Sequence, residues 1–443
     1  MGLGDHLRQQ LAAKALKRQL ERVTEGGADT APAPAPAPAA AGVHASPRSR
    51  FESMPQYQQL RIMREMGETL GVESPFFRVH DGLAGATTLI GGREYLNYAN
   101  YNYLGLAGDA TVTAHAKQAI DRYGTSASAS RMVAGERPVQ RDLEHALAAF
   151  YGTDDCVVFV SGHATNVTVI GSLFGQGDLI VHDSLAHNSI VQGAQLSGAK
   201  RLSFPHNDWR ALDALLARVR HEYRNVLIAI EGLYSMDGDF PDLPKFVEIR
   251  KRHGAFLMVD EAHSLGVLGA TGRGIREHFG VAAEDVDLWM GTLSKTLAGC
   301  GGFIAGCQPL TDMLRHLAPG FLYSVGLAPV LAAASLSALE ILQREPQRVA
   351  QLRERGRQFL DEARAAGLDT GTSAGYAVVP VITGSSLKAA RWANALFDEG
   401  INVQPIFYPA VEEKAARLRF FICSTHEPGQ ITRTVAALAR LAR

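Results

Sequence analysis

The stretch that decides the fold is residues 286–302, VDLWMGTLSKTLAGCGG. Its apolar start has the composition of a buried β-strand, and it leads into Ser294 and Lys295 among small and hydroxyl-bearing residues. Comparable apolar runs occur at 156–160, 179–183, 226–232, 255–262 and 302–306, and helix-patterned segments such as 209–223 lie between them. This alternation predicts an α/β fold with a mostly parallel sheet covered on both faces. Ligands of such sheets gather at the carboxyl ends of the strands.

The regions on either side have different patterns. Residues 1–50 predict a helix over 1–24, followed by the extended Ala-Pro linker APAPAPAPAA at 31–40. Residues 51–110 form an N-terminal segment with a small hairpin around Gly91-Gly92. We expect a large domain over 111–335 and a small α+β domain over 336–443. The evidence for the small domain is a long helix-like stretch from about 329 to 367, strand-like runs at 376–382, 401–407 and 418–424, and a final helix from about 428.

Charge and cysteine content exclude several classes of function. The 44 basic and 45 acidic residues give a net charge of -1, so nothing indicates nucleic acid as a partner. Four cysteines without a CxxC pair fit a reduced, cytoplasmic protein and give no zinc site. The start MGLGDHLRQQ is too charged for a signal peptide. Prolines and glycines interrupt the uncharged stretch 317–339, so we expect no transmembrane span.

Polar residues that follow the strands are the candidate site residues. Ser161-Gly162-His163 leads from a strand into a helix pattern, and either binds an anion or is an ordinary turn. A metal site at Asp260 and His263 lacks any further ligand spacing. Lys295 does not belong to a phosphate-binding loop of the GxxxxGK[ST] type, because that pattern is absent.

One cofactor explains these residues together. A glycine turn can hold a phosphate, and a buried aspartate can pair with a protonated pyridine nitrogen. A histidine can stack on a ring, and a lysine at a later strand end can form a Schiff base. This combination predicts a pyridoxal 5'-phosphate site, in which the ring accepts electrons from a carbanion and the lysine serves as nucleophile and base.

Ten motifs then resemble one family, the α-oxoamine synthases of the aspartate aminotransferase fold (fold type I), from about residue 51 to the C-terminus. They are YNYLGLA (101–107), YGTSASASRMVAGERPVQRDLE (123–144), SGHATN (161–166), HDSLAHNSI (182–190), HND (206–208), EGLYSMDGD (231–239), VDEAHSLGVLGATGRG (259–274), GTLSKTLAGCGG (291–302), YSVGLAP (323–329) and RLRFFICSTHE (417–427). The resemblance implies a seven-stranded, mostly parallel sheet, a small C-terminal domain and a homodimer with shared active sites.

The resemblance also implies a role for each candidate. Lys295 forms the Schiff base and moves the Cα proton, Asp260 pairs with the pyridine nitrogen and His187 stacks on the ring. The phosphate is held by Gly162, His163 and Thr292, and by Ser324 from the neighbouring subunit; the ring hydroxyl is addressed by His263 and Ser235; the amino acid is bound by Arg419, Tyr101 and Ser130. His163 stands where biotin-pathway members often have an apolar aromatic residue, and Val325 stands where some members have threonine.

The implied reaction joins a small amino acid to an acyl thioester, with loss of carbon dioxide and thiol. The motif YNYLG, with Tyr101, resembles that of serine palmitoyltransferase. Ser130 indicates that the amino-acid substrate is serine or alanine rather than glycine. The run GTSASASR…AGERP (124–138) also resembles modules of polyketide assembly lines, whose acyl donor is carrier-bound. The basic helix at 1–24 could dock such an acyl carrier protein, in which case deleting 1–45 weakens turnover of carrier thioesters and spares coenzyme A thioesters. The alternatives are an 8-amino-7-oxononanoate synthase, an aminotransferase, a β-eliminating lyase, a silent partner subunit or a docking scaffold.

Overall fold

A computed structural model describes residues 50–443, so the predicted helix at 1–24, the linker at 31–40 and carrier docking lie outside the described residues. The chain divides into two compact units after Ser74. In the first unit, the short 3-10 helix η1 (Arg50–Ser53) precedes α2 (Pro55–Thr69). Proline at the first position of α2 fits a helix start, where its missing N–H has no partner to lose.

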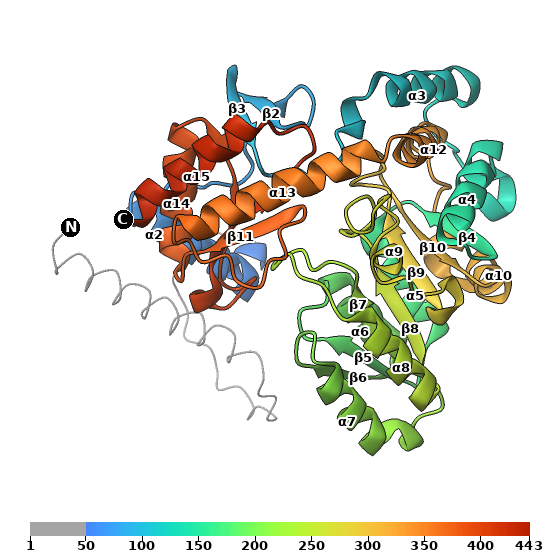
Figure 1. Cartoon of the computed structure of the whole chain (residues 1–443). Coiled ribbons are helices and arrows are strands. Elements are labelled where there is room, and N and C mark those ends of the chain that lie inside the picture. Colours follow the sequence, from blue (N-terminus) through green and yellow to red (C-terminus); the bar gives the residue numbers. More distant parts are fainter. Residues whose placement is uncertain (1–49) are drawn as a thin grey trace, which may run out of the picture. The chain divides into compact units, whose positions relative to one another are not determined.

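The second unit, Pro75–Arg443, is built on a seven-stranded sheet (Figure 1). Its order is β4-β10-β9-β8-β7-β5-β6, and only β10 runs antiparallel to its neighbours. The strands are β4 (Asp155–Phe159), β5 (Leu179–Asp183), β6 (Lys200–Phe204), β7 (Val226–Glu231), β8 (Phe256–Asp260), β9 (Leu288–Thr292) and β10 (Gly302–Gly306). The predicted α/β class and mostly parallel seven-stranded sheet are confirmed.

Each central strand sends alternate side chains into two separate cores, because successive strand residues point to opposite faces. Val158, Val181 and Trp289 lie in one core, and their neighbours Val157, Ile180 and Met290 lie in the other. The first core is shared with α4 (Pro138–Tyr151), α7 (Trp209–Val219), α8 (Leu243–His253) and α12 (Pro329–Arg344), and the second with α5 (Gly162–Leu173), α6 (Asn188–Ser197) and α10 (Gln308–Leu317). The sheet is therefore covered on both faces, as its apolar strands require.

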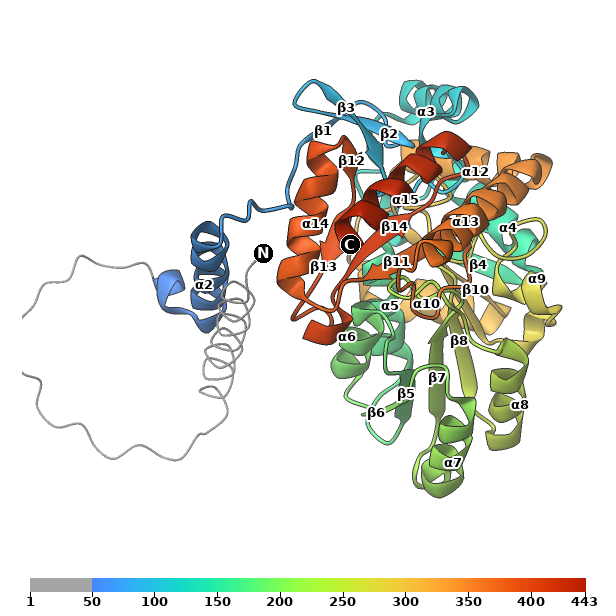
Figure 2. The same ribbon diagram turned by 60° about the vertical axis from the view of Figure 1, so that its left-hand side comes forward.

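Two smaller sheets complete this unit. The antiparallel small sheet has the order β11-β14-β13, with β11 (Val378–Ile382), β13 (Gln404–Ile406) and β14 (Arg417–Phe421). Helices α13 (Gln347–Ala365), α14 (Ser386–Asp398) and α15 (Pro428–Ala442) lie beside it (Figure 2). The other sheet joins β1 (His80–Asp81), β2 (Thr87–Ile90) and β3 (Arg93–Asn97) to β12 (Ile401–Asn402). The predicted hairpin is β2–β3, and its turn glycines have φ values of 59° and 78°.

Other elements connect the sheets. They are α3 (Ala110–Tyr123), the π-helical turn η3 (Arg131–Gly135), α9 (Ile275–Phe279), α11 (Pro319–Leu322), and the 3-10 turns η2 (Leu106–Gly108), η4 (Arg220–Glu222), η5 (Ala283–Asp285) and η6 (Glu413–Ala415). Within residues 50–443, no helix combines the length and the apolar character that a membrane crossing needs.

The structure corrects three expectations about elements. Strand β6 was not predicted, because at the sheet edge only Phe204 of its five residues is buried. The helix-like stretch 329–367 is two helices, since Pro346 has no N–H to continue α12. The run 401–407 is divided between two sheets at Val403, with β12 parallel to β3 and β13 antiparallel to β14.

Candidate active site

Asp260 lies at the carboxyl end of β8, in register with Glu231 of β7 and Met290 of β9. It is only 4% exposed. Asn166 Nδ2 donates to its Oδ2 at 2.8 Å, and the N–H of Ala262 donates to its Oδ1 at 2.9 Å. These two donors fix the orientation of the Asp260 carboxyl group.

Lys295 follows β9 in a turn closed by Thr292, whose hydroxyl donates to the carbonyl of Gly301 at 2.9 Å. The Nζ of Lys295 lies 5.7 Å from the ring centroid of Tyr101 and makes no hydrogen bond with any residue from 50 to 443. Burial lowers the pKa of Lys295 to about 8; Arg419 acts in the same direction, and the carboxylates of Asp260 and Glu231 oppose it. A fraction of this amine is therefore neutral, and nucleophilic, near physiological pH.

Two histidines flank these residues, each fixed by a hydroxyl. His187 Nδ1 lies 2.7 Å from Ser189 Oγ, and His263 Nδ1 lies 2.6 Å from the hydroxyl of Tyr103. Burial lowers the pKa of His187 and holds the pKa of His263 well below its ordinary value. Both rings are therefore neutral at physiological pH, each with one nitrogen left for a ligand.

Gly162 is the first residue of α5, so the free N–H groups of this helix end lie next to β9 and β10. A Cβ on Gly162 would lie 2.9 Å from Thr292 Oγ1, and one on Gly302 would lie 2.7 Å from the Cα of Gly162. The backbones therefore pack more closely than side chains would allow. His163, the next residue, is exposed and its ring centroid lies 6.2 Å from that of His187. Free N–H groups at a helix start, with a hydroxyl beside them, are groups of the kind that bind anions.

Arg419, in β14, reaches this group from the small sheet. Its Nη1 donates to the carbonyl of Ser235 at 3.3 Å, and its guanidinium carbon lies 4.6 Å from the ring centroid of Phe421. Its Nε is buried without a partner among the described residues. Tyr101, which is 39% exposed, packs edge-on against Phe421 at 4.7 Å. A buried N–H of this kind needs an acceptor, and a carboxylate is the one that suits a guanidinium.

Ser130 and Ser324 stand apart from the other candidates. Ser130 precedes η3, and the hydroxyl of Ser324 donates to the carbonyl of Val325 at 3.3 Å. Within residues 50–443, neither makes a hydrogen bond with Lys295. Their segments lie side by side, since the N–H of Gly326 donates to the carbonyl of Ala129 at 2.9 Å.

Three residues of the site were assigned no role from the sequence. Asn166 holds Asp260, Tyr103 holds His263, and Glu231 accepts the backbone N–H of His187 at 2.7 Å. All three lie inside the family motifs, in SGHATN, YNYLGLA and EGLYSMDGD. The signal that could have identified them is a polar residue inside or directly after an apolar strand or helix pattern.

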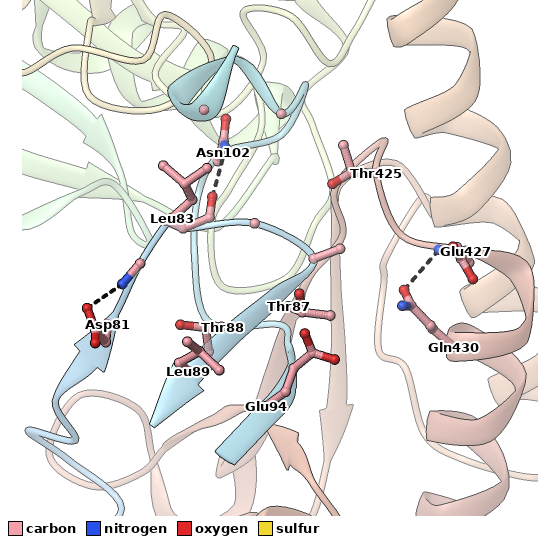
Figure 3. A pocket seen from close by; sticks show the side chains of 16 residues that line it. Asp81, Leu83, Thr87, Thr88, Leu89, Glu94, Asn102, Thr425, Glu427 and Gln430 are labelled. Atoms are coloured by element: carbon pink, nitrogen blue, oxygen red, sulfur yellow. Dashed lines mark hydrogen bonds between the residues drawn. The ribbon is translucent and has the colours of Figure 1, made fainter. Parts of the chain in front are cut away.

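A pocket of about 570 Å³ lies away from Lys295, between the β2–β3 hairpin and the start of α15 (Figure 3). Thr87, Thr88, Asn102 and Glu427 are among its lining residues. No candidate site residue lines it, so its size says nothing about the chemistry at Lys295.

The residues around Lys295 fit pyridoxal 5'-phosphate. The start of α5 and Thr292 leave a backbone cradle that a Cβ would fill. A buried carboxylate stands near a lysine of lowered pKa, and the carbonyl oxygen of Asn166 is buried without a partner among residues 50–443. The phosphate group would meet the backbone cradle, the pyridinium nitrogen would meet the buried carboxylate, and the aldehyde carbon would meet the lysine.

Comparisons with known proteins agree with this fit. Residues 93–438 match the family described as Aminotransferase class I and II. The 8-amino-7-oxononanoate synthase of Geobacter sulfurreducens is 40% identical over 87% of this chain and 97% of its own length. That of Fervidobacterium nodosum is 39% identical over 83% of this chain and 93% of its own.

Solved structures agree too. Serine palmitoyltransferase from Sphingomonas wittichii has a TM-score of 0.85 and 31% identity, covering 89% of this chain and 98% of its own. An 8-amino-7-oxononanoate synthase from Francisella tularensis has a TM-score of 0.67 and 25% identity, covering 78% and 97%. The relatives found by sequence thus favour the predicted alternative, an 8-amino-7-oxononanoate synthase, over the prediction of an enzyme like serine palmitoyltransferase. The chain belongs to the α-oxoamine synthase family of pyridoxal 5'-phosphate enzymes, C-acyltransferases that condense an amino acid with an acyl thioester and release carbon dioxide.

Proposed function

We propose that this chain condenses L-alanine with a pimeloyl thioester, giving 8-amino-7-oxononanoate, carbon dioxide and free thiol. The identities of 40% and 39% to synthases of that name, over more than nine-tenths of their lengths, support this substrate pair. L-serine with a long acyl thioester is the second candidate, supported by the TM-score of 0.85 to serine palmitoyltransferase.

The cofactor would be held by residues from several strand ends. Bound pyridoxal 5'-phosphate supplies an electron-accepting ring that stabilises negative charge at Cα. Asp260, fixed by Asn166, would keep a proton on the ring nitrogen, and His187 would stack on the ring face. Residues that would hold its other groups are Gly162, His163, Thr292 and Ser324 for the phosphate, Ser235 and His263 for the ring hydroxyl, and Lys295 for the aldehyde carbon.

The substrate is positioned by the small sheet. The buried Nε of Arg419, which has no partner in the described chain, carries the proposal, since a carboxylate would accept from it and from a terminal nitrogen together. Lys295, with its lowered pKa, takes the proton from Cα. In the tautomer in which Nδ1 of the neutral His263 ring accepts the hydrogen bond of the Tyr103 hydroxyl, the single ring N–H is at Nε2, where it can polarise the acyl carbonyl. Tyr101 completes the amino-acid site in the same chain. Ser130, whose segment lies beside that of Ser324, would reach this site from the neighbouring subunit.

We also propose a homodimer in which Ser324 serves the site of the neighbouring subunit. Within residues 50–443 of one chain, Ser324 makes no hydrogen bond with Lys295. Exposed apolar residues lie next to Ser324. Tyr323 is 87% exposed and Val325 is 50% exposed, while Met132 and Val133 of the adjoining turn η3 are 58% and 82% exposed. Large apolar side chains grouped on one surface are typical of a protein interface.

An absorbance titration of the holoenzyme with glycine, L-alanine and L-serine tests the function. Pimeloyl and palmitoyl coenzyme A are then added and thiol release is measured, with Lys295→Ala as the inactive control. L-alanine should shift the visible band, and pimeloyl coenzyme A should then release thiol. Thiol release only with serine and palmitoyl coenzyme A would support the second candidate. Loss of the substrate amine without carbon dioxide would indicate an aminotransferase.

A further inference from the structure

His206 lies at the carboxyl end of the large sheet, outside the residues already assigned to the site. Its Nδ1 lies 2.9 Å from Asp183 Oδ1, and its Nε2 lies 3.1 Å from Asp239 Oδ2. The ring meets that of Tyr234 edge-on, with centroids 4.5 Å apart. The Asp183 side chain is 0% exposed and that of Asp239 is 13% exposed. A ring between two such carboxylates is stabilised in its charged form.

The protonation of His206 follows from these neighbours. Burial works against the charged ring, but hydrogen bonds and charge from Asp183 and Asp239 outweigh it and raise the pKa of His206 to about 10. The ring is then an imidazolium at physiological pH, and it donates one N–H to each carboxylate.

Asp239 closes the loop 233–239, which leaves β7 and carries Ser235. Its backbone carbonyl accepts from the N–H of Tyr234 at 2.8 Å. On its other side, this loop contacts the small sheet (Figure 1). Arg417 donates to the carbonyl of Met236 at 2.9 Å, and Arg419 donates to that of Ser235 at 3.3 Å. The loop therefore lies between His206 and the arginine that faces the substrate.

Asp183 fixes the neighbouring loop in the same way. Its Oδ1 accepts from the N–H of Leu185 at 2.8 Å, and its Oδ2 accepts from the N–H of Asn207 at 2.8 Å. Residues 184–187 lead directly to His187, whose ring flanks Lys295. One imidazolium thus joins the loops that carry Ser235 and His187.

We propose that His206 is a positioning residue for the amino-acid site, acting through the loop 233–239 on the guanidinium of Arg419. The inference rests on the proposed role of Arg419 as the carboxylate site. Without the cation, Asp183 and Asp239 repel each other, and the loop that carries the acceptor of Arg419 Nη1 moves. Misplacement of about 1 Å at such a site costs up to about a hundredfold.

The test compares L-alanine binding to holoenzyme variants by calorimetry, with the thermal unfolding of each as a check of folding. His206→Gln removes the charge. His253→Gln is the matched control, because His253 Nε2 also pairs with an aspartate, Asp213, at 2.7 Å, between α7 and the end of α8. Asp239→Asn provides a second variant that removes one of the two carboxylates and keeps the pair of His206 with Asp183.

His206→Gln should raise the Kd of L-alanine by roughly ten- to a hundredfold in folded protein. The ratio of the Kd of this variant to the Kd of the wild type should stay constant from about pH 6.5 to about pH 9, since the His206 ring of the wild type is charged throughout this range. Asp239→Asn should weaken binding less, and His253→Gln should leave it unchanged. Unchanged alanine affinity in folded His206→Gln and Asp239→Asn would overturn the inference. A wild-type holoenzyme that binds no amino acid would instead overturn the proposed function on which the inference rests.

Discussion

At the scale of single residues, the reactivity of Lys295 should appear as a pH dependence of cofactor capture. Burial lowers the pKa of this amine from 10.5 to about 8, so its neutral, nucleophilic fraction increases as the pH rises through about 8. The rate at which the apoprotein binds excess pyridoxal 5'-phosphate should therefore rise with a midpoint near 8, measured by stopped-flow absorbance.

Arg419→Gln is the control for this midpoint. The positive charge of Arg419 helps to lower the pKa of Lys295, so its removal should move the midpoint upward. A wild-type midpoint near the ordinary value for lysine would contradict the burial of the amine. Between pH 8 and pH 10.5, Lys295 is mostly neutral in the folded protein and mostly protonated in the unfolded chain. The contribution of Lys295 to the free energy of unfolding therefore rises with pH over that interval.

The candidate residues differ in how far the sequence could predict them. Lys295 and Asp260 follow apolar strands of one parallel sheet, so the rule for strand ends is enough to bring them together. Arg419 lies in a different sheet, and only the family resemblance placed it in the site. Asn166 and Glu231 were assigned no role, because the partner of a buried polar side chain is set by tertiary packing.

At the scale of elements, the start of α5 should not tolerate a side chain at Gly162. A Cβ there would lie 2.9 Å from Thr292 Oγ1 and 3.2 Å from Thr292 Cβ. Gly162→Ala should push the helix end away from β9. Overpacking costs roughly 1–3 kcal/mol, which corresponds to about five- to 150-fold in cofactor affinity. Equilibrium dialysis of pyridoxal 5'-phosphate measures this loss.

Gly171→Ala in the same helix is the matched control. A Cβ at Gly171 would meet the side chain of Leu196, which is 65% exposed and can move aside. Cofactor affinity should stay at the wild-type level in this variant. Equal affinities in Gly162→Ala and wild type would show that the backbone contact at the start of α5 does not shape the phosphate site.

Elements with strong local signals were predicted well, and those defined by tertiary contacts were not. The central strands of the large sheet are apolar on both faces, so their composition alone identifies them. Strand β6 lies at the edge with four of its five residues exposed or half-buried, and it lacks that signal. The division of 401–407 depends on pairing with β3, which lies about 300 residues earlier in the chain.

At the scale of the whole molecule, chemistry is shared between two sheets that are far apart in the sequence. The large sheet presents Lys295 and Asp260 at its strand ends, and β14 of the small sheet presents Arg419. The loop 233–239 joins them through its contacts with Arg417 and Arg419. Substrate affinity should therefore depend on how the two sheets are held together, which is the role proposed for His206.

A second subunit should complete this arrangement, and mixing two inactive variants tests it. Ser324→Asp places a negative charge where the neighbour's phosphate would bind, and Lys295→Ala removes the nucleophile. In a mixed dimer, one site combines an intact Lys295 with an intact Ser324 from the other chain. Since a two-fold dimer assembles at random, the mixture should regain roughly a quarter of wild-type activity after co-refolding. No recovery, with both variants sedimenting as dimers, would place Ser324 outside the partner's site. Sedimentation of the wild type at the mass of one chain would contradict the dimer itself.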